Sequence, residues 1–342
     1  MTANKSVGVA MGGISSEHPV SLVSGAGMLA NLNPDRYRGF PILISRDNLW
    51  IWPETWAATE VLTPEKAEAW LASPPSGWKT ARFPSFPIFP YCDVMLLGLH
   101  GIGGEDGRLQ GFLDMAGQAY TGSGSLGSAL AMDKISSKHI FQAVGIPTAR
   151  YRVLEEREFP AAKKTLEPEF GYPVVLKTPQ GGSSIGVGIA RNGEELDALL
   201  AALTPGAERL LVEEFLEGKE ATCGYLKGYP PLPPTEIRPL RDGFFNFEAK
   251  YKPGRTEEIT PAEFPAAILA EMQSLAARCH EALQLSVYSR TDFIYSQGKV
   301  FALETNNLPG FTPTSLLPQA AAHSGLSYRD LLTRIIEESL LK

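Results

Sequence analysis

Two short apolar segments each run into a glycine-rich turn and are followed by a helical pattern. The first spans residues 7–11, turns at residues 12–13 and leads into a helix predicted from Val20 onward. The second lies in residues 94–107, apolar at first and then rich in glycine, before a helix predicted over 109–116. Strands that alternate with helices form parallel sheets, whose ligands bind at the carboxyl ends of the strands. The chain is therefore expected to open with a parallel α/β sheet whose glycine turns face one crevice.

At 342 residues the chain is too long for one ordinary core, so two or three domains with a cleft between them are expected. A boundary is predicted near residues 121–125. A second sheet follows, with strands predicted over 172–177, 183–190 and 209–214. The last part opens near residue 215 and contains an amphipathic helix, whose apolar stripe recurs at three- and four-residue steps: Ile268, Met272, Leu275, Cys279 and Leu283.

Residues 46–90 separate the two opening units and are rich in proline and tryptophan. They contain all five tryptophans of the chain: Trp50, Trp52, Trp56, Trp70 and Trp78. Because the segment lacks clean periodicity, an irregular insertion with one short helix over 64–71 is predicted.

Composition excludes several classes of protein. The net charge of −7 argues against a broad nucleic-acid interface, which needs clustered Lys and Arg, so small-molecule substrates are expected. Cys92, Cys223 and Cys279 are widely spaced and form no CxxC, which favours buried thiols in a reducing cytosol over disulfides or zinc. No signal peptide and no bilayer-spanning stretch is found, so a cytoplasmic protein without a membrane partner is expected.

Residues 290–306 carry the most informative pattern, two apolar strands around a turn near Gly298. The pattern is typical of a β-hairpin. If the turn centres on Gly298, four polar residues come to one side of the hairpin, since side chains alternate along a strand. These are Arg290, Asp292, Glu304 and Asn306. In this register Asp292 faces Glu304, and Arg290 faces Asn306.

Opposed carboxylates lie about 5 Å apart at Cβ and repel each other unless something neutralises them. Asp292, Glu304 and Asn306 offer hard oxygen ligands, which suit Mg²⁺ or Mn²⁺ better than zinc, and Mg²⁺ completes its shell with water and substrate phosphates. The alternative is an edge hairpin with ordinary exposed charges. The loop of residues 307–312, placed to present backbone N–H groups beside the same face, favours the metal site.

A second candidate site begins with a predicted strand, residues 173–177, that ends in Lys177 and precedes the glycine-rich residues 181–188. Backbone N–H groups, the hydroxyls of Ser183 and Ser184 and the charge of Lys177 together suit a phosphate, although a plain turn is the alternative. The spacing is not that of a P-loop.

A third glycine pattern, GxGxxG, is formed by Gly122, Gly124 and Gly127. Only a short strand could precede it, and no acid ends a strand about twenty residues further on. A Rossmann dehydrogenase is therefore not favoured.

Together these motifs resemble the D-alanine:D-alanine ligase family of the ATP-grasp superfamily over nearly the whole chain. The matching stretches are residues 12–17, 20–21, 100–101, 104–107, 120–124, 132–134, the Lys177 strand with its glycine loop, 248–251, 290–292 and 304–316. The resemblance implies a three-domain α/β ATP-grasp architecture, in which two α+β domains enclose the nucleotide. The expected domains are an N-terminal parallel α/β sheet on the first-substrate side (1–122), a central domain with the glycine-rich loop (123–213) and a C-terminal domain with a mobile loop and the metal hairpin (214–342).

The resemblance also implies an ADP-forming, ATP-dependent carbon–nitrogen ligase. The carboxylate of one D-alanine attacks the γ-phosphate of ATP to give an acyl phosphate, which the amine of a second D-alanine attacks. The product, D-alanyl-D-alanine, serves peptidoglycan precursor synthesis, and a homodimer is expected from the family.

Residue roles follow from position in the family motifs. ATP is expected to contact Lys134, Lys177, Ser184, Glu213, Glu214, Phe215, Leu216, Glu220 and Lys250. Glu17 is expected to bind the first ammonium and to form a hydrogen-bonded latch with Ser183 and Tyr251, although capping of the following helix is its alternative role. The transition-state oxyanion is expected to meet Arg290 and the Gly310 N–H, and the second carboxylate to meet Ser315 and Leu316. The resemblance also implies that Lys250 reaches the γ-phosphate from a mobile loop, extending to about residue 265, which in the family closes over the site and excludes water.

Several positions depart from the family pattern and leave substrate breadth open: His18-Pro19, residues 244–247, Ser289 and Phe311. The rival functions are a D-alanine:D-lactate or D-alanine:D-serine ligase and a nucleotide-binding homologue without activity. Tyr251 favours the dipeptide type. The last alternative is disfavoured because the residues that such a homologue would lose are all present: Lys177, Arg290, Asp292, Glu304 and Asn306.

Overall fold

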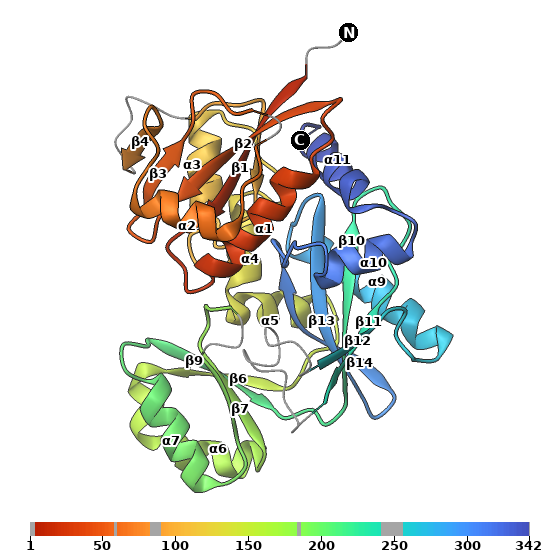
Figure 1. Ribbon diagram of the computed structural model, residues 1–342. Helices are drawn as coiled ribbons and strands as arrows, with labels where there is room; N and C mark the ends of the chain where they lie inside the picture. Colours follow the sequence, from red (N-terminus) through yellow and green to blue (C-terminus); the bar gives the residue numbers. More distant parts are fainter. Residues whose placement is uncertain (1–3, 58–59, 83–89, 183–185, 241–255, 342) are drawn as a thin grey trace.

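The computed structural model describes residues 4–57, 60–82, 90–182, 186–240 and 256–341, which form three sheets with helices packed around them (Figure 1). The sheets follow one another along the chain, with the strand orders β4-β3-β2-β1-β5, β6-β9-β7-β8 and β12-β11-β10-β13-β14. Among the described residues no helix has the length and apolar character needed to cross a bilayer.

The N-terminal sheet has a parallel centre, as predicted. β1 pairs in parallel with β2 and with β5, and its apolar run is buried from Val7 to Gly12, as expected for a strand covered on both faces. The strands are β1 (Lys5–Gly12), β2 (Tyr37–Ile44), β3 (Leu49–Trp52), β4 (Lys79–Arg82) and β5 (Val94–Leu97). The helices are α1 (His18–Asn31), α2 (Pro64–Ala72) and α3 (Arg108–Ala116).

The prediction of an irregular segment over residues 46–90 is wrong in part. β3 and β4 lie in this segment and extend the sheet by two antiparallel strands, while α2 is the short helix that was predicted. Three of the tryptophans, Trp56, Trp70 and Trp78, pack edge to face on one another. These ring contacts hold the segment in place by apolar packing, which the sequence pattern did not reveal.

The central sheet is antiparallel and contains the three strands predicted there, with a fourth strand, β6, beside them. Its elements are β6 (Tyr151–Glu155), η1 (Glu156–Ala161), α6 (Ala162–Phe170), β7 (Val174–Lys177), β8 (Val187–Ala190), α7 (Gly193–Leu203) and β9 (Arg209–Glu214). Asn192 caps α7 by accepting hydrogen bonds from the Glu194 and Glu195 N–H groups. Leu166 and Leu196 fill the small core between these helices and the sheet.

The C-terminal sheet is also antiparallel, and α9 covers one of its faces with the apolar stripe that the sequence predicted. The elements are β10 (Lys219–Leu226), β11 (Thr235–Pro239), β12 (Thr256–Ile259), α9 (Ala266–Ala282), β13 (Tyr288–Ser296) and β14 (Lys299–Asn306). Two earlier helices, α4 (Ser125–Met132) and α5 (Lys134–Ala143), contribute Ala131 and Phe141 to this core.

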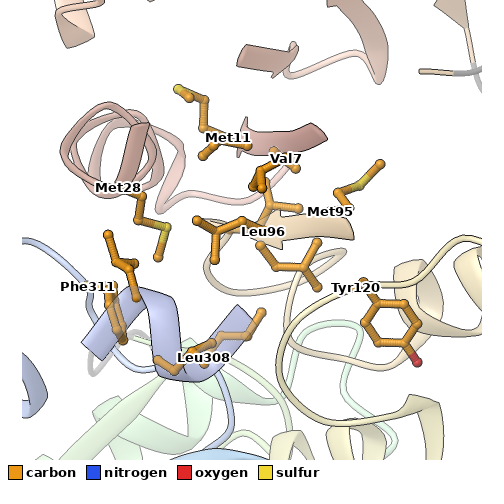
Figure 2. Packing of buried hydrophobic residues seen from close by; sticks show 14 of the residues in the cluster. Val7, Met11, Met28, Met95, Leu96, Tyr120, Leu308 and Phe311 are labelled. Carbon is orange, nitrogen blue, oxygen red and sulfur yellow. The ribbon is translucent and has the colours of Figure 1, made fainter. Parts of the chain in front are cut away.

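The final two helices, α10 (Leu316–His323) and α11 (Tyr328–Ser339), share a core with the N-terminal sheet. Figure 2 shows Leu308 and Phe311, which precede α10, in one cluster with Val7, Met28 and Leu96. The same contacts bring the loop after β14 beside the glycine turns of the N-terminal sheet.

Candidate active site

A cavity of about 370 Å³ lies between the central and C-terminal sheets. Its lining residues come from both sheets, which Figure 1 shows with the central one in green and β13 and β14 in blue. Its polar lining contains Lys134, Lys177, Glu213, Glu214, Glu217, Glu220, Arg290, Asp292 and Glu304. The cavity therefore collects most of the predicted ATP-binding residues and both predicted acidic metal ligands.

The β13–β14 hairpin opposes Arg290 to Asn306 and Asp292 to Glu304, as predicted. The turn lies at residues 296–299, as predicted, but it centres between Gln297 and Gly298 and not on Gly298. Gln297 and Gly298 form a two-residue turn, both with positive φ, and Ser296 faces Lys299. From that turn alone, Asp292 would face Leu303. A β-bulge at Asp292 and Phe293 leaves Leu303 as the extra residue and brings Glu304 opposite Asp292.

Asp292 lies at the centre of a hydrogen-bond network. Its Oδ1 accepts from Arg290 Nε at 2.8 Å and from Thr222 Oγ1 at 2.8 Å. Its Oδ2 accepts from Arg290 Nη2 at 2.9 Å and from Asn306 Nδ2 at 3.2 Å. Thr222 was not predicted; it stands opposite Asp292 on the neighbouring strand β10, a pairing that the sequence alone does not reveal.

Glu304 faces a different cation, Lys134, whose Nζ lies 3.8 Å from Glu304 Oε2. The same Nζ donates to the Gly181 carbonyl at 2.7 Å, so Lys134 ties the start of α5 to the glycine-rich segment. Because Asp292 and Glu304 line one cavity beside Asn306, they offer a hard oxygen set suited to a divalent cation. Within the described ranges no three His, Cys, Asp or Glu side chains cluster as a metal site, so this set rests on two acids and an amide.

A buried carboxylate, Glu213, joins two lysines on the opposite wall. Lys177 contacts its Oε2 and Lys138 its Oε1. Burial alone would raise the pKa of Glu213, but Lys177 and Lys138 together lower it to about 2. Burial alone would likewise lower the pKa of Lys177, but Glu213 raises it above its usual value. Both groups therefore stay charged at neutral pH, and Lys177 presents a fixed positive charge to the cavity.

Glu17 stands where the N-terminal glycine turns meet the central domain. It occupies the N-cap position of α1, but its side chain makes no capping hydrogen bond, which argues against helix capping as its role. A Cβ atom at Gly101 would lie 2.6 Å from Glu17 Oε2, and one at Gly182 would lie 2.5 Å from it. A side chain at either place would displace the Glu17 carboxylate from its present position. Glu17 is thus held between a turn of the first sheet and the loop after Lys177.

His100 and Glu105 are buried next to Glu17. His100 Nδ1 lies 3.1 Å from the Leu308 carbonyl, and its Nε2 lies 2.8 Å from Ser24 Oγ. Burial lowers the pKa of His100, so the ring is neutral, donates through Nδ1 and accepts through Nε2. The Glu105 Oε2 atom accepts from the Gly101 N–H at 3.1 Å.

Replacement of Glu105 by glutamine is expected to raise thermal stability more at pH 8 than at about pH 5. Burial, followed by repulsion from Glu17, raises the pKa of Glu105 from 4.5 to about 8. Between these values the unfolded chain has lost the proton while the folded chain keeps it, so wild-type stability falls as pH rises. Glutamine keeps the accepting oxygen and has no such proton. Melting temperatures at the two pH values test this, and an equal gain at both contradicts it.

The loop after β14 places Gly310 beside Ser315. A Cβ atom at Gly310 would lie 3.3 Å from Ser315 Oγ, which accepts from the Thr312 N–H at 2.9 Å. Ser315 is the N-cap of α10 and Leu316 its first residue, so a carboxylate here would face a helix N-terminus. Of the predicted residues, Ser183, Ser184, Lys250 and Tyr251, with the departing residues 244–247, lie outside the described residues.

The other departures from the family pattern have local structural partners. His18 packs its ring between the Gly13 carbonyl, 2.6 Å from Nδ1, and the Glu68 carboxylate. Ser289 Oγ lies 2.8 Å from His280 Nδ1, and Phe311 contacts the ring of Tyr288 in the core. None of these contacts lies in the cavity lining.

Comparison with solved structures identifies the class of protein to which the chain belongs. The chain superimposes on a D-alanine–D-alanine ligase from Bacillus anthracis complexed with ATP, with a TM-score of 0.74 and 32% identity over 98% of both chains. It matches the VanG D-Ala:D-Ser ligase from Enterococcus faecalis with a TM-score of 0.83 and 29% identity, over 98% of this chain and 99% of the other. The fold and the cavity define an ATP-grasp ligase.

Two family models refine this class, one described as the D-ala D-ala ligase N-terminus, over residues 6–123, and one as the C-terminus, over residues 140–337. The chain belongs to the D-alanine–D-alanine ligase family. It is 40% identical to the D-alanine–D-alanine ligase of Leptospira biflexa over 98% of both chains. It is 45% identical to that of Syntrophobacter fumaroxidans, over 72% of this chain and 80% of the relative.

Proposed function

We propose that the protein joins two D-alanine molecules to D-alanyl-D-alanine, with conversion of ATP to ADP and phosphate. The observation that carries this proposal is the cavity between two antiparallel sheets, in which lysines from one wall face the Asp292 and Glu304 pair on the other. An ATP-grasp ligase needs cations here because the first step moves negative charge onto the departing ADP, and the second step places it on the tetrahedral oxyanion and on the departing phosphate.

Among the described residues, those that hold the nucleotide come from α5, β7, β10 and the end of β9 with the segment after it. Lys177 and Lys134 contact the phosphates, and Lys250 reaches the γ-phosphate. The segment Glu213 to Leu216 begins with the last two residues of β9 and binds adenine, while Glu220 near the start of β10 binds ribose. Ser184 adds a hydroxyl to the phosphate subsite. In support, all of these residues within the described ranges line one cavity.

A divalent cation, Mg²⁺ or Mn²⁺, would be held by Asp292, Glu304 and Asn306. When bound, such an ion neutralises phosphate charge and orients the phosphoryl group for transfer. The hard oxygen set and the opposed positions of the two carboxylates support the assignment. Two N–H groups of Arg290 hold Asp292 in place, and Thr222 fixes the same carboxylate from β10.

The first D-alanine binds with its ammonium on Glu17, and its carboxylate oxygen attacks the γ-phosphorus to give an acyl phosphate and ADP. Ser183 and Tyr251 complete the latch with Glu17. The second D-alanine places its carboxylate on Ser315 and Leu316, and its amine attacks the acyl carbon. Arg290 and the Gly310 N–H stabilise the oxyanion until phosphate leaves. The position of Glu17 between Gly101 and Gly182 supports a first-substrate site next to the phosphates.

The protein is expected to release phosphate from ATP only when D-alanine and Mg²⁺ are both present, because the acyl phosphate needs both reactants in the cavity. Phosphate release and dipeptide formation, followed by mass spectrometry, test this together. L-Alanine at the same concentration and a chelated sample are the controls. Phosphate release that is independent of D-alanine, or no release at all, contradicts the proposal.

D-Serine as second substrate is the other candidate, because the fold matches a D-Ala:D-Ser ligase with a TM-score of 0.83. A mixture of D-alanine, D-serine and D-lactate separates the possibilities in one reaction. The dipeptide D-alanyl-D-alanine is expected to be the main product. A larger yield of the mixed product with serine or lactate assigns the protein to that activity instead.

The biological setting is also part of the proposal. The dipeptide would enter peptidoglycan precursor synthesis for cell wall formation, in the cytoplasm, where ATP and D-alanine are available to an enzyme that works as a homodimer. The units that would act together are residues 1–122, 123–213 and 214–342, with α4 and α5 linking the central unit to the C-terminal core.

A further inference from the structure

Lys138 is a charged side chain buried in the middle of α5, with only 1% of its surface exposed. Its Nζ contacts Glu213 Oε1 and donates to Thr148 Oγ1. Glu213 is also almost fully buried, and its second oxygen contacts Lys177. Lys138 thus sits behind the Glu213 and Lys177 pair: among the described residues, Lys177 and Glu213 line the cavity and Lys138 does not.

The contacts of Lys138 continue into the hairpin on the opposite wall. Thr148 Oγ1, which accepts from Lys138, donates to the Ala302 carbonyl at 2.8 Å. The Ala302 N–H donates to the Pro147 carbonyl at 2.8 Å. Ala302 directly precedes the bulged Leu303 and then Glu304. One buried lysine therefore connects the phosphate-side lysine on β7 with the strand that carries a proposed metal ligand.

Burying a cation costs free energy unless the cation is paired and hydrogen-bonded. The partners of Lys138 therefore indicate its role. Lys138 occupies one oxygen of Glu213, which leaves the other oxygen for Lys177. Without Lys138, both oxygens of Glu213 would be available to Lys177, and a bidentate contact would draw its ammonium back from the cavity. The carboxylate itself would have lost half of the charge that compensates its burial.

We propose that Lys138 is a positioning residue of the nucleotide site, which holds Glu213 so that Lys177 points at the phosphates. This inference rests on the proposed function, since it assigns Lys177 to ATP. Lys138 acts through Glu213 and does not touch the nucleotide.

Replacement Lys138→Met is expected to raise KM for ATP and the Kd for ADP by about 10-fold, the loss that follows from one weakened charge-assisted contact. KM for D-alanine is expected to stay within about twofold, because the effect is confined to the nucleotide wall. Lys163→Met is the matched control, since Lys163 also pairs with an acid, Asp197 at 2.6 Å, but lies on α6 away from the cavity. An unchanged Kd for ADP in a folded Lys138→Met protein overturns the proposal.

A double-mutant cycle separates positioning from general packing. If Lys138 acts through Glu213, the variant with both Lys138→Met and Glu213→Gln is expected to bind ADP no more weakly than Glu213→Gln alone. Additive losses overturn the proposal. ADP binding by calorimetry does not require turnover, so a protein that binds ADP but forms no dipeptide contradicts the proposed function without affecting this test.

If Lys138→Met does not fold, the proposal is tested by comparing ADP binding in the variants Thr148→Val and Thr148→Ser. Valine keeps the shape of threonine and loses the oxygen that receives the Lys138 hydrogen bond, whereas serine keeps that oxygen. The valine variant is expected to bind ADP about threefold more weakly than the serine variant, because Lys138 keeps its contact with Glu213 and only part of the lost hydrogen bond is passed on to the nucleotide. Equal affinity in the two variants overturns the proposal.

Discussion

Arg290→Ala is expected to lower kcat/KM for dipeptide formation by about 1,000-fold, the upper range for loss of one oxyanion donor. Arg290 has two tasks at the proposed site. In the proposed mechanism it stabilises the tetrahedral oxyanion, and in the structure its Nε and Nη2 atoms donate to the two oxygens of Asp292. Alanine removes the donor and leaves Asp292 with only part of its hydrogen-bond network, so most of the loss should fall on kcat. Coupled measurement of ADP release gives both constants.

The control for this variant is Arg238→Ala, because Arg238 makes the same kind of contact elsewhere in the sheet. It sits two residues after Glu236 on β11 and donates from Nε and Nη2 to its two oxygens, at 2.8 and 3.1 Å. Arg238 is absent from the described cavity lining. Its loss should lower the melting temperature and leave kcat/KM within about twofold. Similar losses of activity in both variants would show that Arg290 only supports the fold.

Glu304→Gln is expected to lower kcat/KM at low Mg²⁺ by about 100-fold, since even partners outside the metal shell cost 10- to 100-fold in affinity or activity. Glutamine keeps the size and one oxygen of the side chain but removes the negative charge. Part of the lost activity should return as Mg²⁺ is raised, because the remaining ligands still bind the ion weakly. A titration of initial rate against Mg²⁺ concentration measures the shift.

Glu257→Gln is the control variant for the Mg²⁺ titration of Glu304→Gln. Glu257 lies on β12 of the same sheet, is exposed and is absent from the described cavity lining. Its Mg²⁺ dependence is expected to match that of the wild type. If Glu304→Gln also titrates like the wild type, Glu304 is not a metal ligand and its contact with Lys134 is only structural.

The hairpin shows how far the sequence determined the candidate site. Alternation along two strands correctly opposed Asp292 to Glu304, although the assumed turn was displaced from the real one. The bulge at Leu303 compensated for this error. A bulge depends on how two strands twist against their neighbours, so it could not be predicted from residues 299–306 alone. Local periodicity therefore predicted the pairing but not its cause.

Contacts between distant segments were the part that sequence patterns could not supply. The tryptophans of residues 46–90 gave no periodic signal, because their order comes from packing on one another and on β3 and β4. Thr222 and Lys138 were missed for the same reason, since each gains its role from a residue about 70 positions away in sequence. For Lys138, the sequence offered one signal: it lies four residues after Lys134, so the two lysines share one face of a helix.

The shared core of the N-terminal sheet and the last two helices has a consequence for how the chain is made. Val7 and Leu96 leave the ribosome long before Leu332 and Ile336, with which they pack. Between α3 and Ile336 about 220 residues must be added, which takes roughly 10 to 45 s at about 5 to 20 residues per second. During that interval the apolar residues of the first sheet lack their partners from the last two helices, so this core is completed only when translation is nearly finished.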